Sequence, residues 1–373
     1  MREVAALDRA TAAGGDDSDA LARLRLIRTP SIGPVSFRQL IARFGTAAAA
    51  IEALPDLARR GGGRVPAVTD ASAALREMEA VARIGARYLF LGRDDYPPLL
   101  AELSDAPPVI TIRGDLSLTS RDTLAMVGAR NASAASCRFA RGLAQEVAQG
   151  GAVVVSGLAR GIDTAAHEGA GAATIGVIAG GIDVAYPPEN ARLQDRIAAE
   201  ALLVAEMPPG TEPRARHFPH RNRIIAALSL GTVVIEAAPR SGSLITARLA
   251  GEAGREVMAV PGHPSDPRAQ GCNGLIREGA ILIQSAADVL EQIRPIDARV
   301  VRSPASDYAG PPAADPDDAA RAAITALIGH AAVPVDELIR QSGCAPSAVQ
   351  MVLLELELAG RIDRHAGGRV SWR

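Results

Sequence analysis

The chain has 373 residues, of which 48% are hydrophobic and 22% charged, and its formal net charge is −2. This length is sufficient for one large domain with its own core and one or two smaller domains. A net charge near zero excludes a protein that coats nucleic acid with its whole surface, so any nucleic-acid site must be a local patch.

The composition also indicates which kinds of binding site and which cellular location to expect. All 40 basic residues are arginines, and each guanidinium can contact phosphate through several donors and also stack on a base. The three cysteines, Cys137, Cys272 and Cys344, lie far apart, so neither a disulfide framework nor a zinc site is expected. No apolar run reaches about 18 residues, and the N-terminus lacks the apolar stretch of a signal peptide. We therefore expect a cytoplasmic protein without a membrane segment.

The first hundred residues are predicted to contain a tail and a small helical domain. Residues 1–19 are rich in Ala, Gly and Asp and are expected to be disordered. Residues 20–100 are expected to form a helical domain of the SAM or helix-hairpin-helix type. Within it, segment 29–34 (TPSIGP) separates two apolar-periodic stretches and resembles a phosphate-contacting hairpin. A plain helical packing unit is the alternative.

Short apolar runs alternate with amphipathic segments through residues 101–295. The runs are nearly continuous in their apolar character, as in strands that are buried on both faces of a parallel sheet. The order predicts an α/β domain with an extended Rossmann-like, doubly wound and mostly parallel sheet. The predicted strands are 109–112, 124–127, 152–155, 175–178, 202–205, 233–235, 257–260 and 280–283.

The C-terminal region is predicted to be a linker followed by a winged-helix domain. Residues 296–317 are rich in Pro, Ala, Asp and Ser, which is typical of a linker. Residues 318–373 contain helical patterns and then a hairpin with two glycines at its turn, which together predict a winged helix. The predicted elements are the helices 319–328, 334–342 and 346–359 and the hairpin 361–372.

The third helix of this domain lacks the residues that read DNA. It contains no Lys or Arg, whereas a helix that enters the major groove normally offers polar and basic side chains. We therefore expect Val349, Leu353 and Leu354 to pack or to meet a protein partner.

Turns rich in glycine and small polar residues follow four of the predicted strands. Ligands of an open α/β sheet bind beyond the carboxyl ends of the strands, where such turns expose N–H groups at helix N-termini. One turn alone is typical of ordinary structure, and segment 156–163 (SGLARGID) is only a loose glycine match. Four turns on one edge favour an anion site. Its candidate residues are Gly128, Arg130, Ser156, Gly157, Arg160, Gly180, Gly181, Ser241 and Ser243.

Segment 213–223 (PRARHFPHRNR) carries four arginines, no acid and a central aromatic residue. Guanidinium groups reach phosphates while Phe218 stacks on a base, which is the combination that single-strand binders use. Alternatively, the arginines are solvated and Phe218 fills the core, but arginines at a helix N-terminus are unfavourable without a nearby anion. The candidate residues here are Arg214, Arg216, Phe218, Arg221, Asn222 and Arg223.

Several of these motifs together resemble the DNA-processing protein A family, also called Smf. They are the turn at 128–133, the element at 156–163, Phe218-Pro219 with 221–225 (RNRII), Glu236, the stretch 241–247, Pro261-Gly262 and 271–276 (GCNGLI). The resemblance implies a protein that binds single-stranded DNA and forms a homodimer through its Rossmann-like domain. It also implies that the protein protects incoming DNA and loads the RecA recombinase in natural transformation, without a cofactor or a catalytic activity.

The resemblance also implies roles for individual residues. By position, Arg130 holds phosphate, Phe218 stacks a base, and Arg221, Asn222 and Arg223 shape the same pocket. This chain departs from the family at Ala129, where Ser is usual, and at Ala227, where Gly is common.

An enzyme, namely a nucleotide or nucleoside-phosphate hydrolase on a similar sheet, is the alternative from another class. Glu236 occupies the place of its acidic residue, but 229–232 (SLGT) replaces the expected Pro-Gly-Gly turn, and a chain without lysine has no Walker-type motif. Asp163 and His167 fit either a base with its orienting carboxylate or, as we favour, a cap with a packed histidine. His217 and His220 lack partners at metal-ligand spacing. We expect no catalytic residue and no metal or cofactor site.

Overall fold

The structure, a computed structural model, describes residues 17–294, 315–365 and 367–373. It divides into two compact units, Glu77–Val301 and a second unit formed by Met1–Arg76 with Arg302–Arg373. Most of the predicted N-terminal tail and of the predicted linker lies outside the described residues. Residues 17–19, which were assigned to the tail, begin a helix that runs over residues 17–28.

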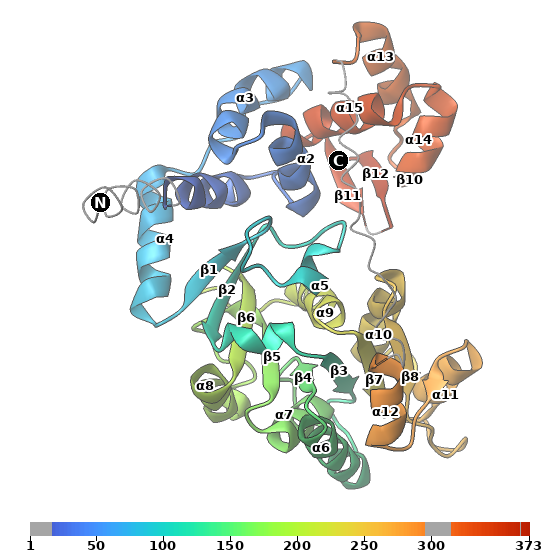
Figure 1. Cartoon of the computed structure of the whole chain (residues 1–373). Coiled ribbons are helices and arrows are strands. Elements are labelled where there is room, and N and C mark those ends of the chain that lie inside the picture. Colours follow the sequence, from blue (N-terminus) through green and yellow to red (C-terminus); the bar gives the residue numbers. More distant parts are fainter. Residues whose placement is uncertain (1–16, 295–314, 366) are drawn as a thin grey trace. The chain divides into compact units, whose positions relative to one another are not determined.

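A nine-stranded sheet forms the centre of unit Glu77–Val301, with the order β1-β2-β6-β5-β4-β3-β7-β8-β9 (Figure 1). Along this order, β6, β5, β4, β3, β7, β8 and β9 are all parallel to one another. Strand β2 is antiparallel to both of its neighbours, β1 and β6. All eight predicted strands are present, and the predicted α/β fold class is confirmed. The strands are β1 Arg87–Phe90, β2 Val109–Gly114, β3 Thr123–Gly128, β4 Val153–Ser156, β5 Thr174–Gly181, β6 Leu202–Met207, β7 Gly231–Ile235, β8 Glu256–Ala259 and β9 Ile281–Leu282.

The strand β1 was not predicted, because it lies within the residues assigned to the helical domain. Its four residues change from exposed Arg87 to buried Leu89 and Phe90, which is too short a run to show a period. As one of the two edge strands it pairs with β2 alone, so the sheet begins before residue 101.

Helices cover both faces of the sheet because consecutive strand residues point to opposite sides. Leu124 and Met126 pack with helices α6, α7 and α12, whereas Ala125 and Val127 belong to the core beneath α8, α9, α10 and α11. The helices of this unit include α5 Pro98–Ala101, α6 Ala134–Gln149, α7 Ile162–Ala170, α8 Ala191–Glu200, α9 His217–Ala227, α10 Gly242–Glu252, α11 Gln270–Arg277 and α12 Ala286–Ile293, and α4 Ala71–Arg83 crosses the boundary between the units.

The strand order reverses direction at the middle of the sheet. From β3 the chain continues to β4, β5 and β6 on one side and then returns to β7, β8 and β9 on the other. The connections at the carboxyl ends of β3 and β7 therefore diverge and leave a crevice, the position where ligands bind in doubly wound sheets.

The second unit joins the N-terminal helices to the predicted winged-helix domain, which is confirmed. Its three-stranded sheet has the order β10-β12-β11, and the short strand β10 was not predicted. No described helix is both long and apolar enough to cross a membrane. The further elements are α2 Pro34–Phe44, α3 Ala47–Arg60, α13 Asp318–Leu327, β10 Val333–Pro334, α14 Val335–Ser342, α15 Pro346–Leu358, β11 Ile362–His365 and β12 Arg369–Trp372.

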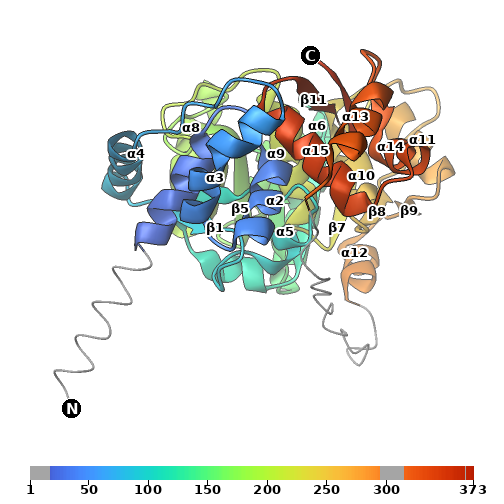
Figure 2. The same cartoon turned by 90° about the horizontal axis from the view of Figure 1, so that it is seen from above.

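Helix α15 packs against α3 within this unit (Figure 2). Leu354 and Leu358 are buried in the same core as the apolar residues of α2 and α3. A Cβ atom at Gly61 would lie 2.1 Å from the carbonyl oxygen of Glu355, so glycine permits this close approach. Val349 and Leu353 are buried within the winged helix itself. The expectation that the apolar residues of the third helix pack is confirmed.

Candidate functional site

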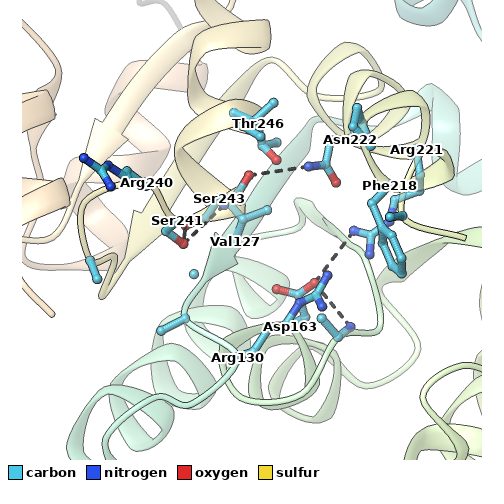
Figure 3. A pocket seen from close by; sticks show the side chains of 18 of the residues that line it. Val127, Arg130, Asp163, Phe218, Arg221, Asn222, Arg240, Ser241, Ser243 and Thr246 are labelled. Carbon is cyan, nitrogen blue, oxygen red and sulfur yellow. Dashed lines mark hydrogen bonds and ion pairs between the residues drawn. The ribbon is translucent and has the colours of Figure 1, made fainter.

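A cavity of about 570 Å³ opens at the carboxyl ends of β3 and β7, where the strand order reverses (Figure 3). The turn after β3, the first turns of α9 and the turn into α10 form most of its wall. Segments more than 100 residues apart in the sequence thus meet at one edge of the sheet. Of the predicted site residues, the wall contains Gly128, Arg130, Phe218, Arg221, Asn222, Ser241 and Ser243.

Two glycines allow the turns to approach each other. A Cβ atom at Gly128 would lie 2.0 Å from the carbonyl oxygen of Ile235 on β7. Gly161 has φ +78°, and a Cβ atom there would lie 2.3 Å from the carbonyl oxygen of Ala129. A side chain at either position would separate the turns, so these glycines keep the cavity walls in place.

The start of α9 turns three predicted residues toward the cavity. Arg221 and Asn222 lie three and four positions after Phe218, so both are on the helical face that Phe218 occupies. Figure 3 shows all three at the wall. Arg223 lies on another face, where its guanidinium is 2.5 Å from Glu206 Oε1 and 3.6 Å from Asp105 Oδ2. Its assignment to the pocket is corrected, because Arg223 is a buried ion-pair residue.

The Arg221 side chain is only 7% exposed and has little compensation for its charge. Its nearest carboxylate oxygen, Asp163 Oδ2, is 3.9 Å from Nη1, which is beyond hydrogen-bond distance. Its buried Nε has no hydrogen-bond partner among the described residues. Burial lowers the pKa of Arg221 to about 10, opposed by Asp163 and assisted by Arg130, so the guanidinium stays charged at neutral pH. A buried cation in this state favours an anionic ligand.

Asp163 positions the loop that faces Arg221. Its Oδ2 accepts hydrogen bonds from the backbone N–H groups of Gly157 at 3.2 Å and Ala159 at 3.3 Å. Burial raises the pKa of this carboxyl group, although Arg221 and the two N–H groups act in the opposite direction. Arg130 and Arg240 also line the cavity, so three guanidinium groups face one carboxyl group and the wall is net positive.

The Phe218 ring lies at the cavity wall rather than in the core. It is half-buried and belongs to neither of the two apolar cores of the sheet. The Cζ atom of Arg130 is 5.0 Å from the ring centroid, and that of Arg221 is 5.9 Å away. A planar apolar surface is therefore placed directly beside two cations.

Hydroxyl groups at the N-terminus of α10 form the opposite wall. Ser241 is the N-cap, and its Oγ accepts from the N–H of Ser243 at 3.4 Å and lies 2.8 Å from the Ser243 hydroxyl. Thr246 adds another hydroxyl on the same side (Figure 3). Arg240, immediately before the cap, has φ +65°, an uncommon conformation for a residue with a side chain. An eleven-residue helix that begins in this way is suited to an anion.

Other predicted residues do not line this cavity. Ser156 donates its hydroxyl to the carbonyl oxygen of Met126 at 2.6 Å, a structural bond in the sheet. Gly180 and Gly181 instead permit the close approach of the loop near residue 210. Arg160 lines a neighbouring crevice of about 30 Å³ together with Gly157. Arg214 and Arg216 do not line the wall, although Ala215 between them does.

Four residues at the cavity or the adjoining crevice were not among the predicted site residues: Asp163, Arg240, Thr246 and Tyr186. Arg240 directly precedes the predicted turn at 241–246, Thr246 ends that turn, and Asp163 ends the predicted element at 156–163, so position in or beside those turns was an available signal. The place of Tyr186 could be found only in the structure, because the fold brings this residue beside Phe218.

The residues that could have supported catalysis have structural partners. Glu236 accepts from the Ser133 N–H at 2.9 Å and from its hydroxyl at 2.6 Å. Burial opposes its ionisation, but bonds from Ser133 and Ser136 outweigh burial and lower the pKa of Glu236. His167 is held by Thr174 and by the N–H of Leu158, without a hydrogen bond to Asp163 among the described residues. His167 is therefore the packed histidine that we favoured, whereas Asp163 is not the helix cap: the N-cap of α7 is Gly161, and Asp163 binds the loop before the helix.

Metal-ligating side chains do not converge in the described part of the chain. No group of three or more His, Cys, Asp or Glu residues there is arranged to hold a metal ion. The Nδ1 atom of His217 accepts from the N–H of Arg214 at 3.3 Å, so this ring has a local structural partner.

Fold and cavity together define a class: Rossmann-like proteins with an arginine-lined cavity at the switch point of a parallel sheet. The chain belongs to the family of DNA recombination-mediator protein A, whose model matches residues 87–294. The DprA-like N-terminal HHH domain matches residues 17–80, and the DprA winged helix domain matches residues 309–368.

Individual relatives agree with this assignment. The chain is 46% identical to DNA processing protein DprA of Streptococcus pneumoniae over 202 residues, covering 53% of this chain and 71% of the relative. It is 38% identical to protein Smf of Escherichia coli over 284 residues, covering 74% of this chain and 75% of the relative. Among solved structures, DprA from S. pneumoniae has a TM-score of 0.57 at 40% identity, covering 66% of this chain and 81% of that one. DNA processing protein A from Helicobacter pylori, studied for its single-stranded DNA binding mode, has a TM-score of 0.51 at 30% identity. The match covers 55% of this chain and 95% of that one.

Proposed function

We propose that this protein binds single-stranded DNA in the cavity between β3, α9 and α10. The observation that carries the proposal is the buried Arg221, whose charge has only a distant carboxylate and whose Nε lacks a partner among the described residues. A phosphate beside Arg221 and Arg130 would supply the missing acceptors. The hydroxyl groups and N–H groups at the start of α10 would hold a neighbouring phosphate.

The Phe218 ring makes a single strand the better ligand. The faces of paired bases are covered by stacking within a duplex, and only the base edges are accessible in its grooves. A base must therefore be unstacked before it can lie on an aromatic ring at the wall of a cavity. This requirement favours single strands without selecting a particular sequence. The similar protein from H. pylori, whose structure was studied for its single-stranded DNA binding mode, supports the proposal of this ligand.

The wider role that we propose is protection of incoming DNA and loading of the RecA recombinase during natural transformation. In this role the protein acts in the cytoplasm as a homodimer through its Rossmann-like unit, without a cofactor and without catalysing a reaction. Membership of the DNA recombination-mediator protein A family supports the role. The structural partners of Glu236 and His167 favour a binding protein over a nucleotide hydrolase.

The binding proposal is tested with single-stranded and blunt duplex oligonucleotides of equal length, each at two salt concentrations. We expect tighter binding to the single strand and a steep loss of affinity with salt, because the contacts are mostly between guanidinium and phosphate. Nucleotide hydrolysis is assayed on the same preparation. Equal affinities for the two DNAs would contradict the proposal, and hydrolysis that is abolished by Glu236→Gln would favour the enzyme.

The wider role is tested separately. The lag before RecA hydrolyses ATP on a single strand coated with single-strand-binding protein should shorten when this protein is added. Sedimentation should give the mass of a dimer. An unchanged lag would contradict RecA loading without affecting the DNA-binding proposal.

A further inference from the structure

Tyr186 lies beside the proposed base-stacking residue. Its ring centroid is 5.8 Å from that of Phe218, and the two ring planes are inclined by 57°. The side chain is 43% exposed, and it is the one aromatic residue among the large exposed apolar side chains of the described residues. An exposed aromatic ring next to a binding cavity offers a face to a ligand that is itself planar.

The loop that carries Tyr186 is held in place by hydrogen bonds on both sides. The Nδ2 atom of Asn190 donates to the carbonyl oxygen of Leu158 at 2.8 Å, which ties the loop to the wall below it. The Nε2 atom of Gln194 donates to the carbonyl oxygen of Val184 at 3.2 Å, and Asp183 Oδ1 accepts from the N–H of Gly210 at 2.8 Å. The backbone near Tyr186 is therefore ordered before a ligand arrives, which lowers the entropy lost on binding.

The space between the two rings is too small to admit a base. The crevice lined by Tyr186 and Phe218 has a volume of about 30 Å³, which is room for one or two water molecules but not for a base. A base on Tyr186 must use the exposed part of its ring. The separation of 5.8 Å between the rings exceeds the rise of about 3.4 Å per nucleotide along a duplex strand. The two rings thus suit neighbouring bases that are no longer stacked on each other.

The charges around the crevice suit a backbone that passes from one ring to the other. Arg130 and Arg221 line both the large cavity and the crevice. Arg160 lies on the crevice side with its side chain 65% exposed, and its nearest carboxylate oxygen, on Glu189, is 3.6 Å away. Guanidinium groups are therefore available on both sides of Phe218.

We propose that Tyr186 is a second base-stacking residue, which holds the nucleotide next to the one on Phe218. This inference rests on the proposed binding of single-stranded DNA. It extends the contact surface from the cavity across Phe218 to the loop between β5 and α8, and it adds affinity without sequence preference because every base has a face that can stack.

The test is photo-cross-linking of the full-length protein to a single strand that contains 5-iododeoxyuridine, a base that cross-links to the aromatic ring on which it stacks. We expect cross-linked peptides at both Phe218 and Tyr186. Cross-linking at Phe218 alone would overturn the inference and leave the proposed function intact. If the strand neither binds nor cross-links, the proposed function fails as well.

Two substitutions separate stacking from a supporting role for Tyr186. Tyr186→Phe keeps the ring and should bind single strands within about twofold of the wild type. Tyr186→Leu keeps an apolar contact with Phe218 but removes the ring, so affinity should fall about 5- to 150-fold, as for one lost stack, with the salt dependence unchanged. The same melting temperature in all three proteins shows that folding is intact. Equal affinity of Tyr186→Leu and the wild type would overturn the inference.

Discussion

Replacing Gly157 with alanine should remove the Arg221 guanidinium from the cavity without deleting its charge. A Cβ atom at position 157 would lie 1.5 Å from Nη1 and 2.3 Å from Cζ of Arg221. These atoms are at the far end of a flexible side chain, so the guanidinium can move while the backbone stays. Arg221→Ala is a less direct test, because it deletes the charge and the packing of the whole side chain together.

The expected loss follows from the contact that is broken. A hydrogen bond to a charged group contributes about 1.5–3 kcal/mol, so Gly157→Ala should weaken single-strand binding about 10- to 150-fold. The slope of log affinity against log salt should become shallower by about 0.7, the value for one phosphate of a single strand. Fluorescence anisotropy with a labelled oligonucleotide at four salt concentrations measures both quantities.

Gly142→Ala is the matched control for this substitution. A Cβ atom at Gly142, inside α6, meets no atom within 4 Å, so the same chemical change has no steric consequence there. It should leave binding unchanged and stabilise the fold by about 0.5–1 kcal/mol through helix propensity. If Gly157→Ala binds with the affinity and salt slope of the wild type, Arg221 does not contact phosphate from its observed position.

Three further predictions address the ring, a buried histidine and the C-terminal region. Phe218→Ala should cost about 1–3 kcal/mol of affinity for single strands, without changing the slope of log affinity against log salt. Arg130→Ala should weaken binding and also make that slope shallower. A folded Phe218→Ala protein with normal binding would show that Phe218 does not belong to the site. Burial first, and then Arg221, lowers the pKa of His167 to about 3, below its ordinary 6.5, so the unfolded chain binds the proton more readily. Stability should therefore fall by about 2 kcal/mol between pH 7 and pH 5, a dependence that His167→Asn should lack in urea titrations. Deletion after Arg294 should leave single-strand affinity within about threefold but destabilise the N-terminal helices, and a large loss of affinity would place DNA contacts in the deleted region.

The sheet could be predicted because its signal is local. Each parallel strand is a short apolar run such as 152–155. Because both faces of such a strand are buried, its residues do not alternate between apolar and polar, and the run stands out in the sequence. The strand β1 lacked this signal, since its Arg87 is exposed at the edge of the sheet. Its place depends on pairing with β2, which a local pattern does not encode.

The direction of side chains within the site was harder to predict than its location. Segment 213–223 was correctly expected to begin a helix, but its arginines were treated as one group. Helical geometry separates them, because Arg221 turns to the cavity while Arg223 turns to Glu206. The glycines 180 and 181 resembled ligand turns although they serve a backbone contact. Composition predicts where charge gathers, but the rotation of 100° per residue decides which charges face a ligand.

The pairing of both chain ends in one unit has a consequence for biosynthesis. The helices near Phe37 and Leu57 are made early, yet the residues that cover them, Leu354 and Leu358, are made about 300 residues later. At about 5–20 residues per second, the apolar face of these helices waits roughly 15–60 s for its cover. The sheet unit can fold during that interval, because all its residues precede Leu354 in the chain. A ribosome that stalls after the sheet has emerged would therefore hold a chain with all residues of the proposed DNA site and an open, aggregation-prone N-terminal face.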